Sequence, residues 1–230
     1  MLHYGRNNNE ISYKMNNVVL SEDSSMKDLG VLFNNKLKFD EHIAKITSSA
    51  NSKLGVIKYV LHNIDKEGFL VLFKSIVRPI LEYGSSIWYP YLKKHEKKIE
   101  TIQRRATRMI RGLDNLSYQD RLRALKLPTL FYRRKRSDLI QVFKIIKKID
   151  KIDTANFFTY DVGITRRNNE FKLYKPRSEK SLKQHSFSHR FINDWNELSN
   201  KVTGGNTVNS FKAALEVEWK DKEFKYNFQF

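Results

Sequence analysis

Hydrophobic positions change their period twice along this chain. In residues 11–15 they alternate with polar positions, and a second apolar stretch follows Asn16-Asn17, a pair that suits a tight turn. A further short apolar run, 29–33, ends at Asn34-Asn35. The pattern predicts small β-strands within residues 1–39. Strands this few and short do not form a stable sheet by themselves.

From Asp40 the apolar residues recur every three or four positions, which is the spacing of one helix face. Asp40 and Asp65 are expected as N-caps, and Pro79 should kink or end the second helix because proline lacks a backbone N–H. Ser117 and Thr129 open two later helices, a short one and a long one. The predicted helices cover about 40–61, 66–79, 93–111, 118–125 and 129–149.

After Asp150 the helical period is lost until about residue 185. Two strand-like pieces lie near 157–164 and 170–174, and two further helices are expected near 188–198 and 208–219. The sequence therefore predicts a mainly α fold with a helical bundle-like core, a small N-terminal β element and a short β piece near 157–175. Three domains are expected, 1–39, 40–150 and 151–230.

The formal net charge of +18 narrows the choice of partners. A chain this basic repels itself, so it favours an anionic partner, and nucleic acid is preferred over an acidic membrane surface. A merely soluble, lysine-rich protein is the plainer alternative. The absence of cysteine excludes a disulfide scaffold, a zinc knuckle and a thiol nucleophile. No apolar run predicts a transmembrane helix or a signal peptide, so an intracellular protein of nucleus or cytoplasm is expected.

The helix predicted at 93–111 has two opposite faces. Ile99, Ile102 and Ala106 lie on an apolar arc, Gln103 and Thr107 flank the other side, and no acidic residue interrupts the basic face. A rigid row of cations can meet several phosphates of a nucleic-acid backbone at once. A solvated helix face is the alternative, but such faces usually mix signs. The predicted binding residues are Lys94, Lys97, Lys98, Arg104, Arg105, Arg108 and Arg111.

Two other basic regions are less specific. Arg133 and Arg134 belong to a run of four cations, and some members of such a run must face the core side of a helix. Nucleic-acid binding is one interpretation of the run, and a localisation signal is the other. Lys45 lies on the outward side of the first helix and joins the predicted binding residues. Between 166 and 185, cations alternate with aromatic rings, which suits either single-strand binding by stacking or a sheet edge protected by charge. These residues are Arg166, Arg167, Phe171, Lys172, Tyr174, Lys175, Arg177, Lys180, Lys183 and His185.

No candidate catalytic or metal site emerges. Two-metal nucleotidyl transfer needs converging carboxylates, but the sequence has no Asp-Asp pair, and Glu22-Asp23 sits in a polar turn. His185 and His189 are four residues apart without the glutamate of a metalloprotease helix, so ordinary polar roles are favoured. Trp195 shares a helical face with Phe191 and is interpreted as core rather than as a base-stacking residue.

The order and spacing of several blocks resemble the C-terminal region of jockey-like and chicken-repeat-like non-LTR retrotransposon reverse transcriptases. The resemblance covers nearly the whole chain, with Leu198-Ser199 departing from the Leu-Pro usual after Trp-Asn-x. The blocks are Lys27-Asp28-Leu29-Gly30-Val31, Leu37-Lys38-Phe39, His42-Ile43, Val77-Arg78-Pro79-Ile80-Leu81-Glu82-Tyr83-Gly84, Trp88, Pro90, Gln103-Arg104-Arg105-Ala106-Thr107-Arg108, Gly112, Leu127-Pro128-Thr129-Leu130, Arg133-Arg134, Asp138-Leu139, Lys172-Leu173, Trp195-Asn196-Glu197-Leu198 and Ser210-Phe211-Lys212.

The resemblance implies a structural role for each part of the chain. Residues 1–39 would be the edge of the palm, 40–150 a thumb or connector, and 151–230 a C-terminal extension. The family copies element RNA by target priming, with Mg²⁺ held by palm aspartates, so this chain alone is expected to be inactive and to need no cofactor of its own. Its partners would be RNA and DNA, as template–primer duplex and element RNA, and its start at Met1 would mark a truncated element or gene-model fragment. A stand-alone, non-enzymatic basic helical DNA- or RNA-binding protein is the alternative; a peripheral membrane protein is disfavoured.

Overall fold

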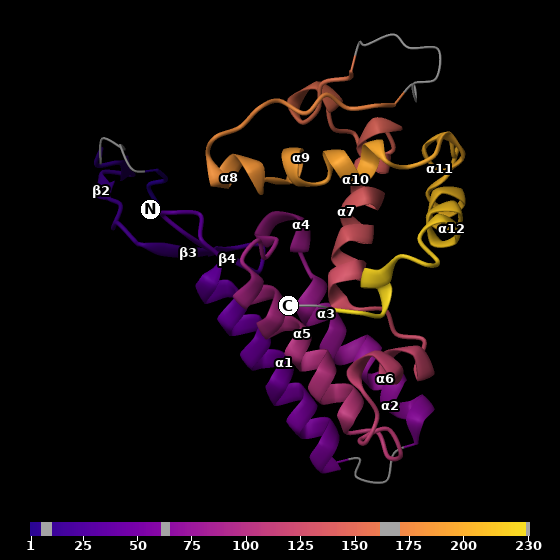
Figure 1. The fold of residues 1–230 in the computed structure, drawn as a ribbon. Helices are drawn as coiled ribbons and strands as arrows, with labels where there is room; N and C mark the ends of the chain where they lie inside the picture. Colours follow the sequence, from indigo (N-terminus) through magenta and orange to yellow (C-terminus); the bar gives the residue numbers. More distant parts are fainter. Residues whose placement is uncertain (6–10, 61–64, 162–170, 229–230) are drawn as a thin grey trace. The chain divides into compact units, whose positions relative to one another are not determined.

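The computed structural model describes residues 1–5, 11–60, 65–161 and 171–228, and they are mainly helical (Figure 1). Two two-stranded sheets accompany the helices, so the predicted fold class is confirmed. The chain divides into two compact units, Met1–Arg111 and Gly112–Phe230. This division lies at the Gly112 turn, away from the boundary expected near 150. The three-domain division stays a prediction.

The N-terminal β segment of unit 1 consists of two antiparallel hairpins. Strands β1 (Lys14–Met15) and β2 (Val18–Val19) pair, as do β3 (Ser25–Asp28) and β4 (Val31–Asn34). Asn16 and Asn17 both have positive φ, as a two-residue hairpin turn requires, so the predicted turn is confirmed. Leu29 was expected in a strand, but Asp28 pairs with Val31 and places Leu29 and Gly30 in the second turn, both at positive φ.

The helices of unit 1 follow the predicted stripes, with one irregular turn. Asp65 caps α2, since its Oδ1 accepts the Gly68 N–H at 2.9 Å. Pro79 does not end the helical path; a π-helical turn precedes it and Pro79 occupies the first turn of α3, where proline is tolerated. The elements are α1 (Asp40–Val60), α2 (Lys66–Leu72), η1 (Phe73–Val77), α3 (Arg78–Glu82), α4 (Ser85–Trp88) and α5 (Lys93–Arg108).

The core of unit 1 joins the hairpin to the helices. Trp88 is fully buried, and the His42 ring lies 5.2 Å from it. The Leu32 N–H donates to His42 Nδ1 at 3.2 Å, which ties β4 to α1. Gly84, at φ +64, packs against Val31 and Trp88, so a side chain there would meet both strain and a close neighbour.

Unit 2 is built around the long helix α7 (Leu130–Ile146). Thr129 caps it, since its hydroxyl accepts the Tyr132 N–H at 3.0 Å, and Ser117 caps α6 in the same way; the cap at Ser117 and the helix start at Thr129 were predicted. Helix α7 ends at Ile146, earlier than expected. The other elements are α6 (Tyr118–Ala124), η2 (Thr154–Asn156), α8 (Ser181–Gln184), α9 (Phe187–Arg190), α10 (Ile192–Asn196), α11 (Asn200–Thr203), α12 (Val208–Glu218) and η3 (Glu223–Lys225).

The helix expected at 188–198 is divided, with Phe191 between α9 and α10. A short β piece was expected near 157–175. In the described residues it is an isolated antiparallel bridge between Tyr160 and Leu173. Residues 162–170, which carry parts of both strand-like pieces as well as Arg166 and Arg167, lie outside the described residues.

Aromatic rings from distant segments fill the core of unit 2. Phe211 of α12 stacks on Phe143 of α7 with ring centroids 4.4 Å apart, and Trp195 of α10 lies against Phe211 at 6.0 Å. Trp195 is fully buried and its indole N–H donates to the Phe171 carbonyl at 2.8 Å. The interpretation of Trp195 as a core residue is confirmed. In the part of the chain that the structure describes, no helix is both long and apolar enough to cross a membrane.

Candidate nucleic-acid interface

Helices α1 and α5 run side by side in unit 1 in the same direction (Figure 1). Near their N-termini, Asp40 Oδ1 lies 2.9 Å from His95 Nε2 and 3.2 Å from Lys94 Nζ. Further along, Arg105 donates to Asn51 Oδ1 at 3.1 Å. Partners at both places are separated by a nearly constant number of residues, so these contacts fix a parallel register.

The outer face of α5 carries cations along its whole length. Lys93 and Arg108 mark its ends, about 22 Å apart at the helical rise of 1.5 Å per residue. Thr101 is the one exposed residue of the helix that is not basic. The exposed residues are Lys93, Lys94, Lys97, Lys98, Thr101, Arg105 and Arg108. This row, which we call the α5 basic face, contains no exposed carboxylate, because Glu96 of the first turn is half-buried beside it, and it spans the distance of several backbone phosphates.

The α5 basic face is narrower than the sequence predicted. Gln103 and Thr107 were expected to flank it, but both are buried, as are His95 and Glu100. The buried side of α5 therefore extends well past its apolar arc, and Arg104 is half-buried at the edge. The helix ends at Arg108, so Arg111 is exposed but lies beyond it, next to the Gly112 turn.

Asp40 is a carboxylate close to one end of the face. Burial raises the pKa of Asp40, but hydrogen bonds and charge from Lys94 and His95 outweigh it and hold the pKa below its usual value. Burial lowers the pKa of His95, against the opposing influence of Asp40. Asp40 is thus ionised at neutral pH and offsets part of the charge of Lys94. The side chains of Lys98 and Arg108 make no hydrogen bond or ion pair to another described residue.

The remaining predicted residues have different surroundings. Lys45 is exposed on α1. Arg133 of α7 is half-buried, whereas Arg134 is only 1% exposed, so the structure does not present Arg134 as a surface contact for phosphate. Its position follows from the geometry of a four-cation run, which cannot keep every member on one side of a helix. Lys135 in the same run donates to both carboxylate oxygens of Asp194, at 2.8 and 2.6 Å.

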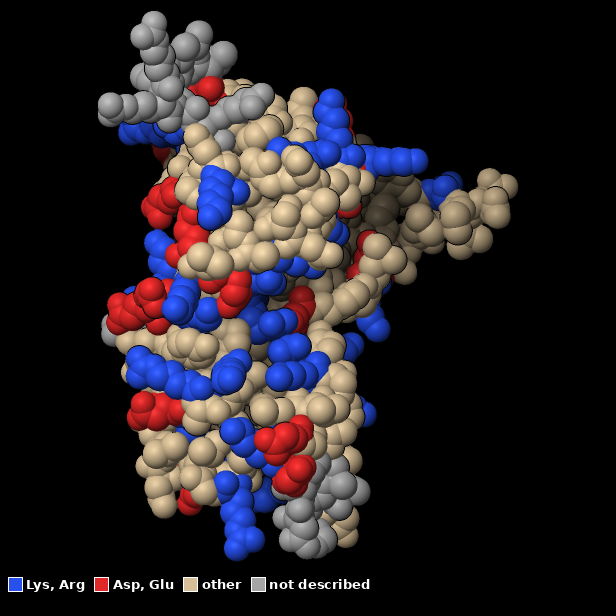
Figure 2. All heavy atoms as spheres, turned by 90° about the vertical axis from the view of Figure 1, so that its right-hand side faces the viewer, with Lys and Arg blue, Asp and Glu red and all other residues tan. Residues whose placement is uncertain are grey.

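The face shown in Figure 2 gives a comparison for the charge pattern of α5. On the face shown in Figure 2, lysine and arginine outnumber acidic side chains, but the two signs are interspersed. Interspersed charge is the ordinary pattern of a solvated surface. The acid-free α5 basic face departs from that pattern, which makes it the strongest candidate for phosphate contact.

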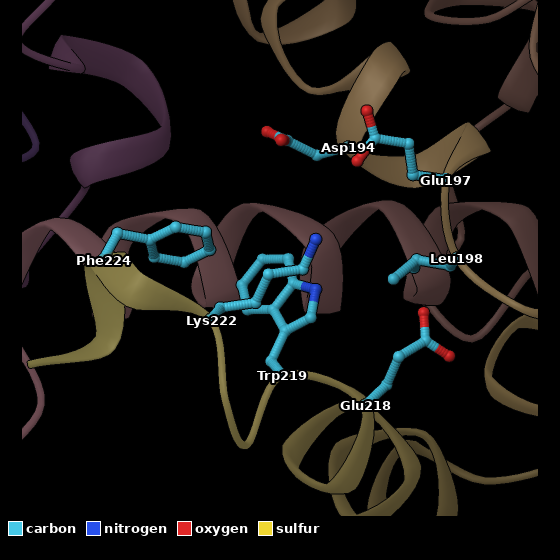
Figure 3. Close-up of a pocket in the computed structure, with 7 residues that line it drawn as sticks. All are labelled: Asp194, Glu197, Leu198, Glu218, Trp219, Lys222 and Phe224. Carbon is cyan, nitrogen blue, oxygen red and sulfur yellow. The ribbon is translucent and has the colours of Figure 1, made fainter.

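Sequence reasoning missed an acidic pocket in unit 2. Asp194 and Glu197 approach from α10, while Glu218, Trp219 and Phe224 approach from α12 and η3 (Figure 3). Its residues come from separate segments, so no sequence motif marks it. Two of its carboxylates already have partners: Asp194 binds Lys135, and Glu218 accepts hydrogen bonds from Ser199. Residues outside the pocket lining therefore already pair with these two carboxylates.

The candidate ligands His185, His189 and the Glu22-Asp23 pair have separate, ordinary partners or face solvent. His189 is buried and its Nε2 lies 2.7 Å from the Pro176 carbonyl, while His185 is exposed and follows α8. Glu22 lies 3.6 Å from His3, and Asp23 lies near the N-terminal amine. Among the described residues, no group of three or more histidine, aspartate or glutamate side chains could hold a metal ion.

Half of the chain is similar in sequence to two polymerases of mobile elements from Drosophila melanogaster. It is 30% identical over 118 residues to a probable RNA-directed DNA polymerase from transposon X-element, and 28% identical over 120 residues to the RNA-directed DNA polymerase from mobile element jockey. Each match covers 50% of this chain and 13% of the relative. The matches support a reverse-transcriptase-related origin, for a chain that spans a small part of those relatives.

A third relative is an uncharacterized protein of Caenorhabditis elegans, 22% identical over 149 residues, which are 64% of this chain and 72% of that protein. No protein-family model matches the chain. No solved structure matches it.

Proposed function

We propose that this chain is the nucleic-acid-holding part, downstream of the catalytic palm, of a non-LTR retrotransposon reverse transcriptase. The observation that carries the proposal is a sequence similarity to two RNA-directed DNA polymerases, which covers half of this chain and 13% of the length of each polymerase. The order of the sequence blocks supports the finer assignment: residues 1–39 as palm edge, 40–150 as thumb or connector, and 151–230 as extension.

In this proposal the α5 basic face holds the backbone of the template–primer duplex. Its cations project from a helix whose other side is buried, so few degrees of freedom are lost when phosphates bind. Arg105 and Arg108 can contact phosphate oxygens through two N–H groups each. In this proposal, phosphoryl transfer is carried out by aspartates of the palm, which hold Mg²⁺. This sequence does not contain that pair of aspartates.

The α5 basic face is tested by removing charge without changing shape. The variant replaces Lys98, Arg105 and Arg108 by glutamine, and affinity for a labelled RNA–DNA duplex is measured over a range of salt concentrations. Backbone binding has a log–log slope of about 0.7–0.9 per phosphate neutralised, and each cation that no longer meets a phosphate should make the slope shallower by about one. The fold should persist, because exposed substitutions usually change stability by about 0.5 kcal/mol or less.

A matched control removes the same charge from the rest of unit 1. Lys14, Lys36 and Lys74 are exposed and lie outside α5, and their replacement by glutamine lowers the net charge by the same amount. This control should keep most of the slope. Equal decreases in both variants would show that net charge, rather than the α5 basic face, determines the affinity.

A second candidate function is a stand-alone basic helical protein that binds DNA or RNA without a polymerase. The similarity to the C. elegans protein favours it, because there the match covers 72% of the relative rather than a small segment. Genomic sequence directly upstream discriminates the two. An open frame that encodes an aromatic-x-Asp-Asp hairpin supports the polymerase, and its absence supports the stand-alone protein.

A further inference from the structure

Unit 2 holds an extended segment, residues 171–177, along helices α9 and α10. Phe171, Leu173 and Pro176 are each hydrogen-bonded through their backbone carbonyls to a side chain of those helices, namely Trp195, Asn196 and His189, at 2.8, 2.8 and 2.7 Å. The segment begins beside Trp195 and Asn196 of α10 and reaches His189 of α9 at Pro176, so it runs antiparallel to these helices (Figure 1). The helices hold it by its main chain.

The other edge of the segment is also bonded. The Asp161 N–H donates to the Lys172 carbonyl at 2.9 Å, and the Tyr174 N–H donates to the Thr159 carbonyl at 2.8 Å. Cations often protect a strand edge that would otherwise pair with another chain. Here the Lys172 carbonyl, both backbone groups of Leu173 and the Tyr174 N–H are already bonded, so little of this stretch is open to pairing with another chain.

The side chains that the segment turns outward are one aromatic ring and two cations. Leu173 is buried, but Tyr174 is 53% exposed, and Lys175 and Arg177 are exposed. None of these three side chains makes a hydrogen bond or ion pair with another residue that the structure describes. Lys172, by contrast, lies 3.7 Å from Asp161 and is partly neutralised.

We propose that Tyr174, Lys175 and Arg177 form a second nucleic-acid site that binds a single strand, with a base stacked on the Tyr174 ring and phosphates at the two cations. Base stacking on an exposed aromatic beside cations is how sequence-tolerant single-strand sites work. Three residues of extended chain span about 10 Å, so one short stretch of strand can meet both groups. The hydrogen bonds to Trp195, Asn196 and His189 hold the segment in place before the ligand arrives, which lowers the entropic cost of binding.

The test uses the full chain and a labelled oligouridine. Tyr174→Ala should weaken its binding by about fivefold to a hundredfold, the range for loss of one stacked base. Tyr174→Phe keeps the ring and should bind like the unchanged chain. Tyr59→Ala is the control, because it removes a different exposed tyrosine, which belongs to unit 1. Unchanged affinity of Tyr174→Ala, or an equal loss in Tyr59→Ala, overturns the proposal.

A second measurement does not depend on variants. Photocrosslinking with an oligonucleotide that contains 5-iodouridine should attach the base to Tyr174, as mapped by peptide mass; reproducible attachment elsewhere, with none at Tyr174, would reject the site. The α5 glutamine variant separates this site from the proposed function. It should lose duplex affinity and keep oligouridine affinity, while Tyr174→Ala does the reverse. Loss of both affinities in the α5 variant would show that single strands bind on α5.

Discussion

Asn196 takes the place of a neighbouring strand for Leu173. Its Oδ1 accepts the Leu173 N–H at 2.9 Å, and its Nδ2 donates to the Leu173 carbonyl at 2.8 Å. One amide side chain therefore satisfies both backbone groups of a buried residue. Because the two residues lie far apart in the sequence, this pair joins the extended segment to α10.

Asn196→Ala should destabilise unit 2, because it leaves two backbone groups of a buried residue without partners. Each unsatisfied group costs about 1–3 kcal/mol, so the melting temperature should fall clearly. Asn193→Ala, an exposed change on the same helix, should stay within about 0.5 kcal/mol of the unchanged chain. Similar melting of the two variants would mean that the Leu173 bonds contribute little.

Trp195→Ala should cost more, about 3–5 kcal/mol, because it leaves a cavity beside Phe211 and removes the indole donor of the hydrogen bond to the Phe171 carbonyl. Trp195→Phe separates the two effects, since it refills most of the space but cannot donate. Chemical denaturation monitored by circular dichroism gives both values. A Trp195→Ala chain with unchanged unfolding but lost RNA affinity would return this residue to a binding role.

The β1–β2 hairpin should exchange its amide hydrogens among the fastest parts of the chain. Met15, Val18 and Val19 are all more than half exposed, and a two-stranded hairpin without a covering layer is marginal in water. Hydrogen exchange followed by mass spectrometry should show peptides over residues 11–20 exchanging well before those of α7. Slow exchange there in a monomer would show that another part of the chain covers the hairpin.

Local rules predicted much of this fold. The caps at Asp65 and Ser117, the helix start at Thr129 and the turn at Asn16-Asn17 depend on residues within a few positions of one another, and these are confirmed. The core position of Trp195 also followed from helical spacing. In each case the deciding atoms are close in sequence, so the pattern carries the information.

The errors lie where tertiary packing overrides the local pattern. Glu100, Gln103 and Thr107 are polar, yet α5 buries them, which no hydrophobic stripe indicates. Arg134 is buried by the same kind of override. The hydrogen bonds from His189 and Asn196 join segments more than ten residues apart, so no motif spacing marks them. The binding residues predicted on α5 were placed on an exposed face in most cases, but their contact with nucleic acid stays a prediction.

The chain alone should not extend a primer. Its sequence has no pair of adjacent aspartates, which the aromatic-Asp-Asp hairpin of reverse transcriptases supplies for two-metal transfer. Primer extension on an RNA template with magnesium or manganese, and with a no-protein control, is the measurement. Template-dependent incorporation above that control would contradict the prediction and would show that other carboxylates of the chain hold the metal ions.

Acid should loosen unit 1 through His42. Burial, and to a smaller extent the charge of Lys45, lower the pKa of His42 below the ordinary value of 6.5. Its Nδ1 accepts the Leu32 N–H, which requires the neutral ring, and the ring is buried against Trp88. A histidine with a depressed folded pKa takes up its proton more readily when unfolded. Its contribution is therefore constant above about pH 6.5 and is lost as pH falls from there toward the folded pKa.

His42→Asn tests this directly. The asparagine Oδ1 replaces Nδ1 as the acceptor for Leu32 but does not titrate, so the variant should lose less stability than the unchanged chain between about pH 7.5 and 5.5. Some acid sensitivity should remain, because burial also lowers the pKa of His95 and of His185. Thermal melting at both pH values gives the comparison. An equal loss in the two proteins would show that His42 is protonated without breaking its bond to β4, and the acid response would then belong to the other histidines.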